Sequence, residues 1–162
     1  MKLPDPGLYR TTQPYPGKEA EIPAEVLVFV GVAPNGGLPF VVRPGSNRNN
    51  RWYWGEPTIP LRALNWAEKL VSLPPEGFYT LPEDVSTEAG GRWLKNAIVQ
   101  LGYNGEGHGI IFVAEQHSDE PRNLLVFSDR GRLIDDKLLR RLQWAPILPV
   151  DSGQASAASA TK

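Results

Sequence analysis

The chain has 162 residues, and none of them is cysteine. This absence excludes disulfide bonds, zinc sites and iron–sulfur clusters bound through thiolates, and every cysteine nucleophile. Chains without disulfides are the rule in reducing compartments. We therefore expect a cytoplasmic protein that is stabilised by its hydrophobic core rather than by covalent links.

Long apolar runs are also missing. The longest, 26–30 with Val32 and Ala33 close behind it, is far shorter than the ~20 residues that cross a membrane as a helix. No apolar segment follows Lys2, so we do not expect a secretory signal. The sequence therefore predicts that the protein has no membrane partner.

Neither sign of charge is in excess. The chain has 17 Lys and Arg residues against 18 Asp and Glu residues, which gives a formal net charge of −1. Domains that bind nucleic acid through their overall charge are strongly basic. Nucleic acid is therefore our second choice of partner, after protein, and it would need a local basic segment.

Glycine, proline and tryptophan are plentiful, with 16, 16 and five residues. Five prolines lie in residues 1–24, where no hydrophobic period is visible, so we predict an extended Pro-rich N-terminal arm. Residues 25–150 carry the apolar segments and are expected to form a single domain. Residues 151–162 are small and polar, which predicts a disordered C-terminal tail.

Two pairs of apolar, β-branched segments predict β-hairpins. They are 25–33 with 38–43, and 109–114 with 124–128. The first pair is joined at 34–37 by a Pro-Asn-Gly-Gly turn, whose Asn and Gly tolerate positive φ angles. We expect a further strand at 51–55 and a short edge strand at 77–81.

Three segments place apolar residues at helical spacing. They are 61–73, a segment from Ser86 or Thr87 to Leu101, and a short segment capped by Asp135 or Asp136 that carries Leu138, Leu139 and Leu142. Pro74 and Gly102 follow the first two as helix stops. We therefore predict an α+β fold, a mainly antiparallel sheet built from the two hairpins with about three helices packed on it.

A short match suggests that a hairpin–helix unit occurs twice. Residues 61–66 and 139–144 share the pattern Leu-Arg-x-Leu-[Asn/Gln]-Trp, and each follows an apolar hairpin. A duplicated unit would explain the match. Ordinary helix packing, in which Leu at i and i+3 lies beside a Trp, would explain it too.

Several predicted strands are apolar on both faces, as in 27–30 and 110–113. Such strands are covered on both sides. A single layer of helices covers one face only. The other face therefore needs the N-terminal arm, another sheet, or a second copy of the protein, so a homodimer is one of three alternatives.

Residues 43–54 concentrate side chains that bind ligands. This segment carries Arg43, Arg48, Arg51 and the aromatic run that includes Trp52 and Trp54, and it has no acidic residue. Arginines bind phosphates or carboxylates, and aromatic faces stack on bases or sugars. The alternative is a solvated turn followed by a strand whose tryptophans belong to the core.

Two further tryptophans stand apart from the leucine stripes of the predicted helices. Trp66 and Trp144 each lie near a helix end, so we predict that they face a partner, because Trp is enriched at interface hot spots. The alternative is that they cover the rim of the core.

No set of residues predicts catalysis. His108 and His117 flank a predicted strand, and the glycines of 105–109 follow a predicted helix and precede a strand, the reverse of a dinucleotide-binding order. The acidic pairs at 83–84 and 135–136 are explained by turns and helix caps. We therefore expect a protein that is not an enzyme, with no catalytic residue, no metal site and no cofactor.

Two functions follow from these patterns. The first is a non-catalytic protein–protein interaction or assembly module, which acts as an accessory subunit or a homo-oligomer. The second is a module that binds nucleic acid or another anionic or ring-bearing ligand through residues 43–54.

Overall fold

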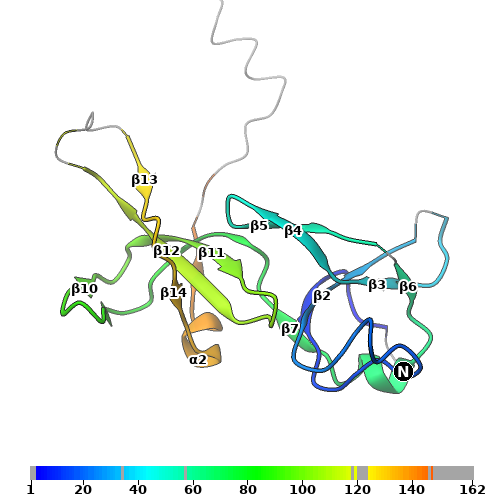
Figure 1. The fold of residues 1–162 in the computed structure, drawn as a ribbon. Helices are drawn as coiled ribbons and strands as arrows, with labels where there is room; N and C mark the ends of the chain where they lie inside the picture. The colour runs from blue at the N-terminus through cyan, green and yellow to red at the C-terminus, as the bar shows by residue number, and fades with distance from the viewer. Residues whose placement is uncertain are drawn as a thin grey trace, which may run out of the picture.

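The structure is a computed structural model that describes residues 3–33, 35–56, 58–117, 119, 124–145 and 147. In these residues it is mostly antiparallel β-sheet (Figure 1), and its helices are α1 (Leu64–Ala67) and α2 (Asp136–Leu139). The expected α+β fold with about three helices packed on a sheet is therefore wrong.

Five strands form the first sheet in the order β6-β3-β2-β1-β7, and each neighbouring pair is antiparallel. Their bounds are β1 (Gly7–Arg10), β2 (Leu27–Gly31), β3 (Phe40–Val42), β6 (Ile59–Pro60) and β7 (Val71–Leu73). Between β3 and β6 the chain forms a separate hairpin of β4 (Pro44–Arg48) and β5 (Arg51–Trp54).

The second sheet has the order β13-β12-β11-β8-β15, and β14 also pairs with β12. Its strands are β8 (Gly77–Thr80), β11 (Ile98–Tyr103), β12 (Gly109–Glu115), β13 (Val126–Phe127), β14 (Arg132–Leu133) and β15 (Gln143–Trp144). A small hairpin of β9 (Val85–Ser86) and β10 (Arg92–Trp93) interrupts the chain between β8 and β11.

The two sheets repeat the same connectivity and the same strand register. In β1 and β2, Tyr9 lies opposite Val28, and in β8 and β11, Tyr79 lies opposite Val99. The match continues to the hairpins, because Trp54 lies opposite Pro44 just as Phe127 lies opposite Ala114. Each chain segment from the first strand to the last also contains one helical turn, α1 or α2, before its final strand. We call β1–β7 the first repeat and β8–β15 the second repeat.

Local sequence supports this repeat. The pattern Leu-Pro-x-x-Gly-[Leu/Phe]-Tyr occurs at 3–9 and again at 73–79. The residues before β2 and β11 also match, because Glu25 and Asn96 both have positive φ angles, 55° and 68°. Such angles are uncommon outside glycine. The chain therefore forms the same backbone turn just before β2 and just before β11.

The Leu-Arg-x-Leu-[Asn/Gln]-Trp match does not mark the repeat. Trp66 lies inside α1, whereas Trp144 lies in β15, beyond α2. By register, the residue of the first repeat that corresponds to Trp144 of β15 is Ser72 of β7, because Trp144 lies opposite Tyr79 and Ser72 lies opposite Tyr9. The hairpin–helix unit expected from this motif is therefore wrong.

Strand pairing overrides the helical spacing of two predicted helices. Residues 61–73 form only the single turn α1 before β7, because β7 pairs along β1. The segment predicted to run from residue 86 to 101 instead forms β9, β10 and most of β11, and Gly102 lies within β11. The third helix is present as α2, and Asp135 caps it by accepting a hydrogen bond from the Leu138 N–H at 2.7 Å.

The N-terminal segment belongs to the sheet. Its strand β1 lies between β2 and β7, and Tyr15 and Ile22 of the same segment are buried. The segment 77–81, predicted as an edge strand, contributes β8, which lies between β11 and β15. The predicted tail, 151–162, lies outside the described residues.

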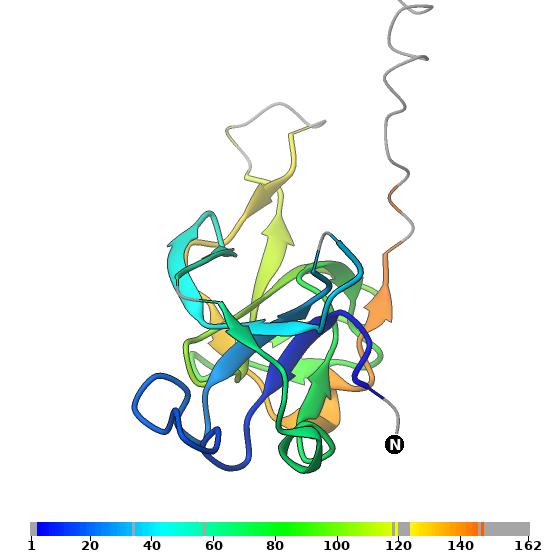
Figure 2. The same ribbon diagram turned by 90° about the vertical axis from the view of Figure 1, so that its right-hand side faces the viewer.

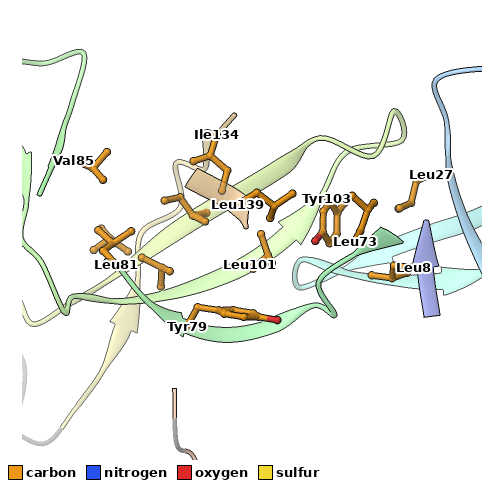
Figure 3. Close-up of a cluster of buried hydrophobic side chains, with 13 residues drawn as sticks. Leu8, Leu27, Leu73, Tyr79, Leu81, Val85, Leu101, Tyr103, Ile134 and Leu139 are labelled. Atoms are coloured by element: carbon orange, nitrogen blue, oxygen red, sulfur yellow. The ribbon is translucent and has the colours of Figure 1, made fainter. Parts of the chain in front are cut away.

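Two hydrophobic clusters stabilise the molecule. One lies within the first repeat and includes Val28 and Val30. The other lies mainly within the second repeat but also contains Leu8, Leu27 and Leu73 of the first. Figure 3 shows Leu8 and Leu27 at the end of the second cluster, beside Tyr103. Both faces of β2 are thus covered by residues of the same chain. A second copy of the protein is not needed to cover them.

Candidate binding groove

A groove of about 800 Å³ lies where the two repeats meet. It is half open to solvent, and its volume is in the range of 300–1,000 Å³ that is usual for ligand sites. The start of β1, the start of β8 and the β4–β5 hairpin all contribute to its lining. The groove is therefore built from both repeats.

Corresponding residues of the two repeats form opposite parts of the lining. Leu8 pairs with Phe29 in the first sheet, and Phe78 pairs with Gln100 in the second. All four line the groove. We use "outer face" for the sheet face that carries these side chains; it includes Leu8, Phe29 and Val42 in the first repeat and Phe78, Gln100 and Phe112 in the second. The groove therefore lies between the outer faces of two equivalent sheets.

The β4–β5 hairpin adds the aromatic part of the lining. Its two-residue turn consists of Asn49 and Asn50, whose φ angles of 51° and 61° suit a tight hairpin turn. Along β5, successive side chains alternate between faces. Trp52 and Trp54 are half-buried on one face, whereas Tyr53 is 50% exposed on the other.

Both tryptophans are held in place. The Trp52 Nε1–H donates to the backbone oxygen of Tyr103 at 2.8 Å, which ties β5 to the second sheet. The Trp54 ring stacks on Phe29 with 5.2 Å between ring centroids. These contacts fix the two rings before any ligand arrives, and such preorganisation lowers the cost of binding.

The hairpin tip is fixed to β11 by a pair of side-chain hydrogen bonds. The Asn50 amide donates to Gln100 Oε1 at 3.2 Å, and the Gln100 amide donates to the backbone oxygen of Asn49 at 3.3 Å. A Cβ atom at Gly102 would lie 3.0 Å from the backbone oxygen of Asn50. Glycine at this position therefore permits the close approach of the hairpin.

Glu76 is the most unusual charged residue of the lining. Its Oε2 accepts a hydrogen bond from the Trp52 backbone N–H at 3.3 Å, while its buried Oε1 has no hydrogen-bond partner among the described residues. Burial raises the pKa of this carboxyl group, and the Trp52 N–H and the charge of Arg51 oppose that rise. A buried acceptor without a donor is costly.

Two buried tyrosines fix the corner between β7 and β8 that carries Glu76. Tyr103 and Tyr79 donate their hydroxyl hydrogens to the backbone oxygens of Pro74 and Pro75, each at 2.7 Å. Burial raises the pKa of Tyr79 to about 12 and raises the pKa of Tyr103 as well. Both hydroxyls therefore stay protonated and act as donors at neutral pH.

On another side of the junction, a bidentate ion pair joins the repeats. The Arg10 guanidinium donates two hydrogen bonds to the Asp136 carboxylate, one of them at 3.1 Å. The Leu27 N–H also donates to the backbone oxygen of Gly105 at 2.9 Å. The hydrogen bond from Arg10 lowers the pKa of Asp136 below its usual value.

The three predicted arginines are not brought together. Arg51 lines the groove. Arg48 lies over the Tyr53 ring at 5.9 Å from its centroid, on the solvent side of the hairpin. Arg43 lines a different, smaller depression that also contains Glu56. Of the residues predicted in 43–54, the groove therefore unites Arg51, Trp52 and Trp54.

The two other predicted tryptophans lie elsewhere. Trp66 is only 2% exposed, stacks edge-on against Tyr15 and donates its indole N–H to the backbone oxygen of Gln13 at 2.8 Å. It is therefore a core residue and does not face a partner. Trp144 is 59% exposed and packs edge-on against Tyr79.

The histidines lie at opposite ends of β12. His108 is 3.5 Å from Glu106, and His117 is 3.5 Å from Glu115. Among the described residues, no cluster of three or more His, Cys, Asp or Glu side chains could hold a metal ion. The expectations of no enzyme activity and no cofactor remain predictions.

Sequence reasoning missed most of the groove residues, among them Phe29, Glu76, Phe78 and Gln100. Phe29 was assigned to an apolar strand, and Gln100 to a helix that does not form. One signal was available, because Glu76 and Phe78 lie within or beside the second Leu-Pro-x-x-Gly pattern. That pattern marks the start of β8 and therefore one edge of the groove.

Comparison with known proteins gives no match to a family model, to a curated protein or to a solved structure. In the described part of the chain, neither four-residue helix has the length that a membrane crossing requires. The function must therefore be argued from the groove itself.

Proposed function

We propose that the protein is a non-catalytic binding module whose groove between the repeats takes an extended segment of another protein. The observation that carries this proposal is the half-open groove lined by Phe29, Trp52, Trp54 and Phe78. Aromatic-lined grooves with a few polar groups are a common mode of peptide recognition. The cysteine-free composition supports a cytoplasmic place for this binding.

The lining has the character of an interface. Its half-buried aromatic side chains supply apolar area, and Asn50, Ser72 and Gln100 supply polar groups around them. Apolar centres with polar rims are typical of protein interfaces, and Trp is enriched at their hot spots. A segment in extended conformation would follow the groove between β5 and the starts of β1 and β8.

Nucleic acid and other anionic ligands fit this groove less well. Asp5 and Glu76 line it together with Arg51, whereas Arg43 and Arg48 lie outside it. Phosphate groups would therefore meet two carboxylates and one guanidinium. Salt-dependent binding to single-stranded nucleic acid would favour the alternative.

A random library of 12-residue displayed peptides tests the proposal. Selection on the full chain should enrich peptides whose affinity falls at least about tenfold in Trp54→Ala, because a tryptophan at an interface hot spot contributes 2 kcal/mol or more. Phe78→Ala, on the opposite wall, should weaken the same peptides. Titration by fluorescence polarisation measures both losses.

Trp144→Ala is the matched control, because Trp144 is an exposed tryptophan of β15 that lies outside the lining of the groove. It should leave peptide affinity unchanged. Thermal unfolding of each variant confirms that it is folded. If the enriched peptides bind Trp54→Ala and Phe78→Ala as tightly as the unmodified chain, the groove is not the binding site and the proposal fails.

A further inference from the structure

We infer that copies of this chain associate head to tail, with the turn between β2 and β3 of one copy packed on β8 and β11 of the next. The inference goes beyond the proposed function, because none of the residues that carry it lines the groove. It rests on the contact between the two repeats. The chain forms this contact once internally and carries a second set of corresponding residues for it.

The turn between β11 and β12 makes the contact in which the second repeat meets the first. The backbone oxygen of Gly105 accepts a hydrogen bond from the Leu27 N–H at 2.9 Å. Gly107 lies so close to Arg10 that a Cβ atom at Gly107 would be 3.2 Å from the Arg10 Cβ. Tyr103, the last residue of β11, is only 3% exposed and belongs to the same buried cluster as Leu27. Arg10 and Leu27 therefore form the surface that receives this turn.

The turn between β2 and β3 repeats the same backbone conformation. The Gly107 N–H donates to the backbone oxygen of Asn104 at 3.0 Å, and the Gly36 N–H donates to that of Ala33 at 3.2 Å. Both glycines have positive φ angles, 76° and 68°. The chain thus builds this turn once in each repeat.

Within one chain, the turn of the first repeat has nothing to pack on. By the register of β2 and β11, Val32 corresponds to Tyr103, but Val32 is 58% exposed. Leu38 of the same turn is 52% exposed, and a Cβ atom at Gly36 would meet no described atom within 4 Å. Figure 1 shows this turn at the end of the molecule that lies away from the second repeat. Its apolar side chains are therefore available to another molecule.

The second repeat carries a counterpart of the receiving surface. By register, Thr80 and Ile98 correspond to Arg10 and Leu27, and they lie opposite each other on β8 and β11. Leu27 is fully buried, whereas Thr80 and Ile98 are half-buried. A single chain therefore has one turn and one receiving surface that it does not bring together.

The contact between copies is expected to be apolar. The ion pair of Arg10 with Asp136, the first residue of α2, has no counterpart, because the corresponding residues are Thr80 and Leu64, the first residue of α1. A second copy is the occupant that this surface fits, since the same turn already packs on the same strands within the chain. Such a contact joins different surfaces of the two copies, so it extends to further copies unless a ring closes.

A contact between like surfaces is the competing arrangement. Two copies could bury Val32 and Leu38 by pairing their β2–β3 turns about a two-fold axis. That arrangement would leave Thr80 and Ile98 as they are in the single chain. The two arrangements therefore differ in whether β8 and β11 take part.

Sedimentation equilibrium of the full chain tests the inference. The average mass should exceed that of the monomer at about 1 mM, a concentration at which even weak specific contacts form. Val32→Asp and Ile98→Asp should each lower the association constant at least about tenfold, because each would bury a charge without a partner. Thr80→Asp replaces Ile98→Asp if thermal unfolding shows that the latter does not fold. Leu133→Asp is the matched control, because Leu133 is 59% exposed and pairs with β12 at the other end of the second sheet.

Mixing two variants separates the two arrangements. Val32→Asp keeps an intact receiving surface, and Ile98→Asp keeps an intact turn. In the head-to-tail arrangement each variant alone stays largely monomeric, and an equal mixture forms dimers that do not grow further. In the two-fold arrangement Ile98→Asp alone would associate as strongly as the unmodified chain, and mixing would restore nothing.

Three results would overturn the inference. They are an unmodified chain that stays monomeric at about 1 mM, a mixture that stays monomeric although the unmodified chain associates, and a loss in Leu133→Asp as large as that in Val32→Asp. None of them bears on the proposed function, because the peptide affinities that test the groove depend on other residues.

Discussion

The two repeats share a fold but use its outer face differently. In the first repeat this face is covered, and Leu8 and Val42 are only 8% and 2% exposed. In the second repeat the corresponding residues, Phe78 and Phe112, are half-buried. The first outer face forms the contact between the repeats, and the second remains accessible as a groove wall. The same sheet therefore buries its outer face at the junction in one repeat and leaves it accessible in the other.

The hairpins account for this difference. Figures 1 and 2 show the β4–β5 hairpin and the β12–β13 hairpin on the same upper side of the molecule. The tip of β4–β5 is bonded to β11 through Asn50 and Gln100, so this hairpin lies over the second sheet as well as the first. In the second repeat, Phe127 of β13 packs on Phe78 of its own sheet. Of the two hairpins, the first therefore bridges the repeats through contacts of its described residues.

The largest change in the free energy of unfolding is expected from alanine substitutions at corresponding positions of β2 and β11. Leu27 is fully buried in the cluster that joins the repeats, whereas Ile98 is half-buried. Leu27→Ala should lower the free energy of unfolding by about 3 kcal/mol, because a tightly enclosed cavity is left behind. Ile98→Ala should cost clearly less. Urea unfolding measures both, and equal losses would contradict the difference in burial.

A smaller effect is expected at the ion pair of the junction. Arg10→Met should reduce the free energy of unfolding by about 1 kcal/mol, because the Arg10 side chain is largely buried but its partner Asp136 is well exposed. Since the hydrogen bond from Arg10 lowers the Asp136 pKa in the folded state, this contribution is present above the unfolded value near 3.8 and is lost as the pH falls through the lowered pKa.

Unfolding of Arg10→Met and the unmodified chain at a series of pH values checks this. The difference between them should be constant at neutral pH and shrink below about pH 4. Thr80→Ala at the corresponding position of β8 should leave the pH dependence unchanged. A difference that persists undiminished at pH 2 would show that packing of the Arg10 side chain, rather than its charge, joins the repeats.

A change in stability of similar size but opposite sign is expected at Glu76. Burial raises the folded-state pKa of Glu76, so its favourable contribution is present below the unfolded value of 4.5 and is lost as the pH rises through the raised pKa. Glu76→Gln should therefore be more stable than the unmodified chain at pH 7, by about 1 kcal/mol. Burial raises the pKa of Tyr103, which also faces this carboxyl group, so the Tyr103 hydroxyl stays protonated throughout this range.

Guanidinium chloride unfolding at pH 7 and pH 4 measures this gain. The advantage of Glu76→Gln should be present at pH 7 and largely gone at pH 4. Lower stability of the variant at pH 7 would mean that the Glu76 carboxylate is satisfied in the folded protein and would contradict this prediction.

The sequence predicts the strands better than the helices. Runs such as 27–31 and 109–115 are β-branched and apolar, and their local preference agrees with the sheet that they join. The segments 61–73 and 86–101 have apolar residues at helical spacing but also carry Val71, Ile98 and Val99, which pair with neighbouring strands. Tertiary pairing of this kind overrides spacing, and a single sequence does not display it.

The groove was predictable only in part. Alternation along 51–54 places Trp52 and Trp54 on one face, and both line the groove. The contribution of Phe78 and Gln100 depends on the way the second repeat packs against the first, which no local pattern encodes. The prediction for Trp66 failed for the same reason, because its place in the core depends on a contact with Tyr15, which is far away in the sequence.

Mapping of amide resonances on a ¹⁵N-labelled chain, titrated with a library-selected peptide, tests the central claim most directly. Binding in the groove should shift the amides of Gly7, Gly77 and Gln100 together with the indole resonance of Trp54, because these residues line it from both repeats. Residues of the β9–β10 hairpin should stay unchanged. Shifts confined to one repeat, or centred on Trp144, would contradict a binding site formed at the junction of the two.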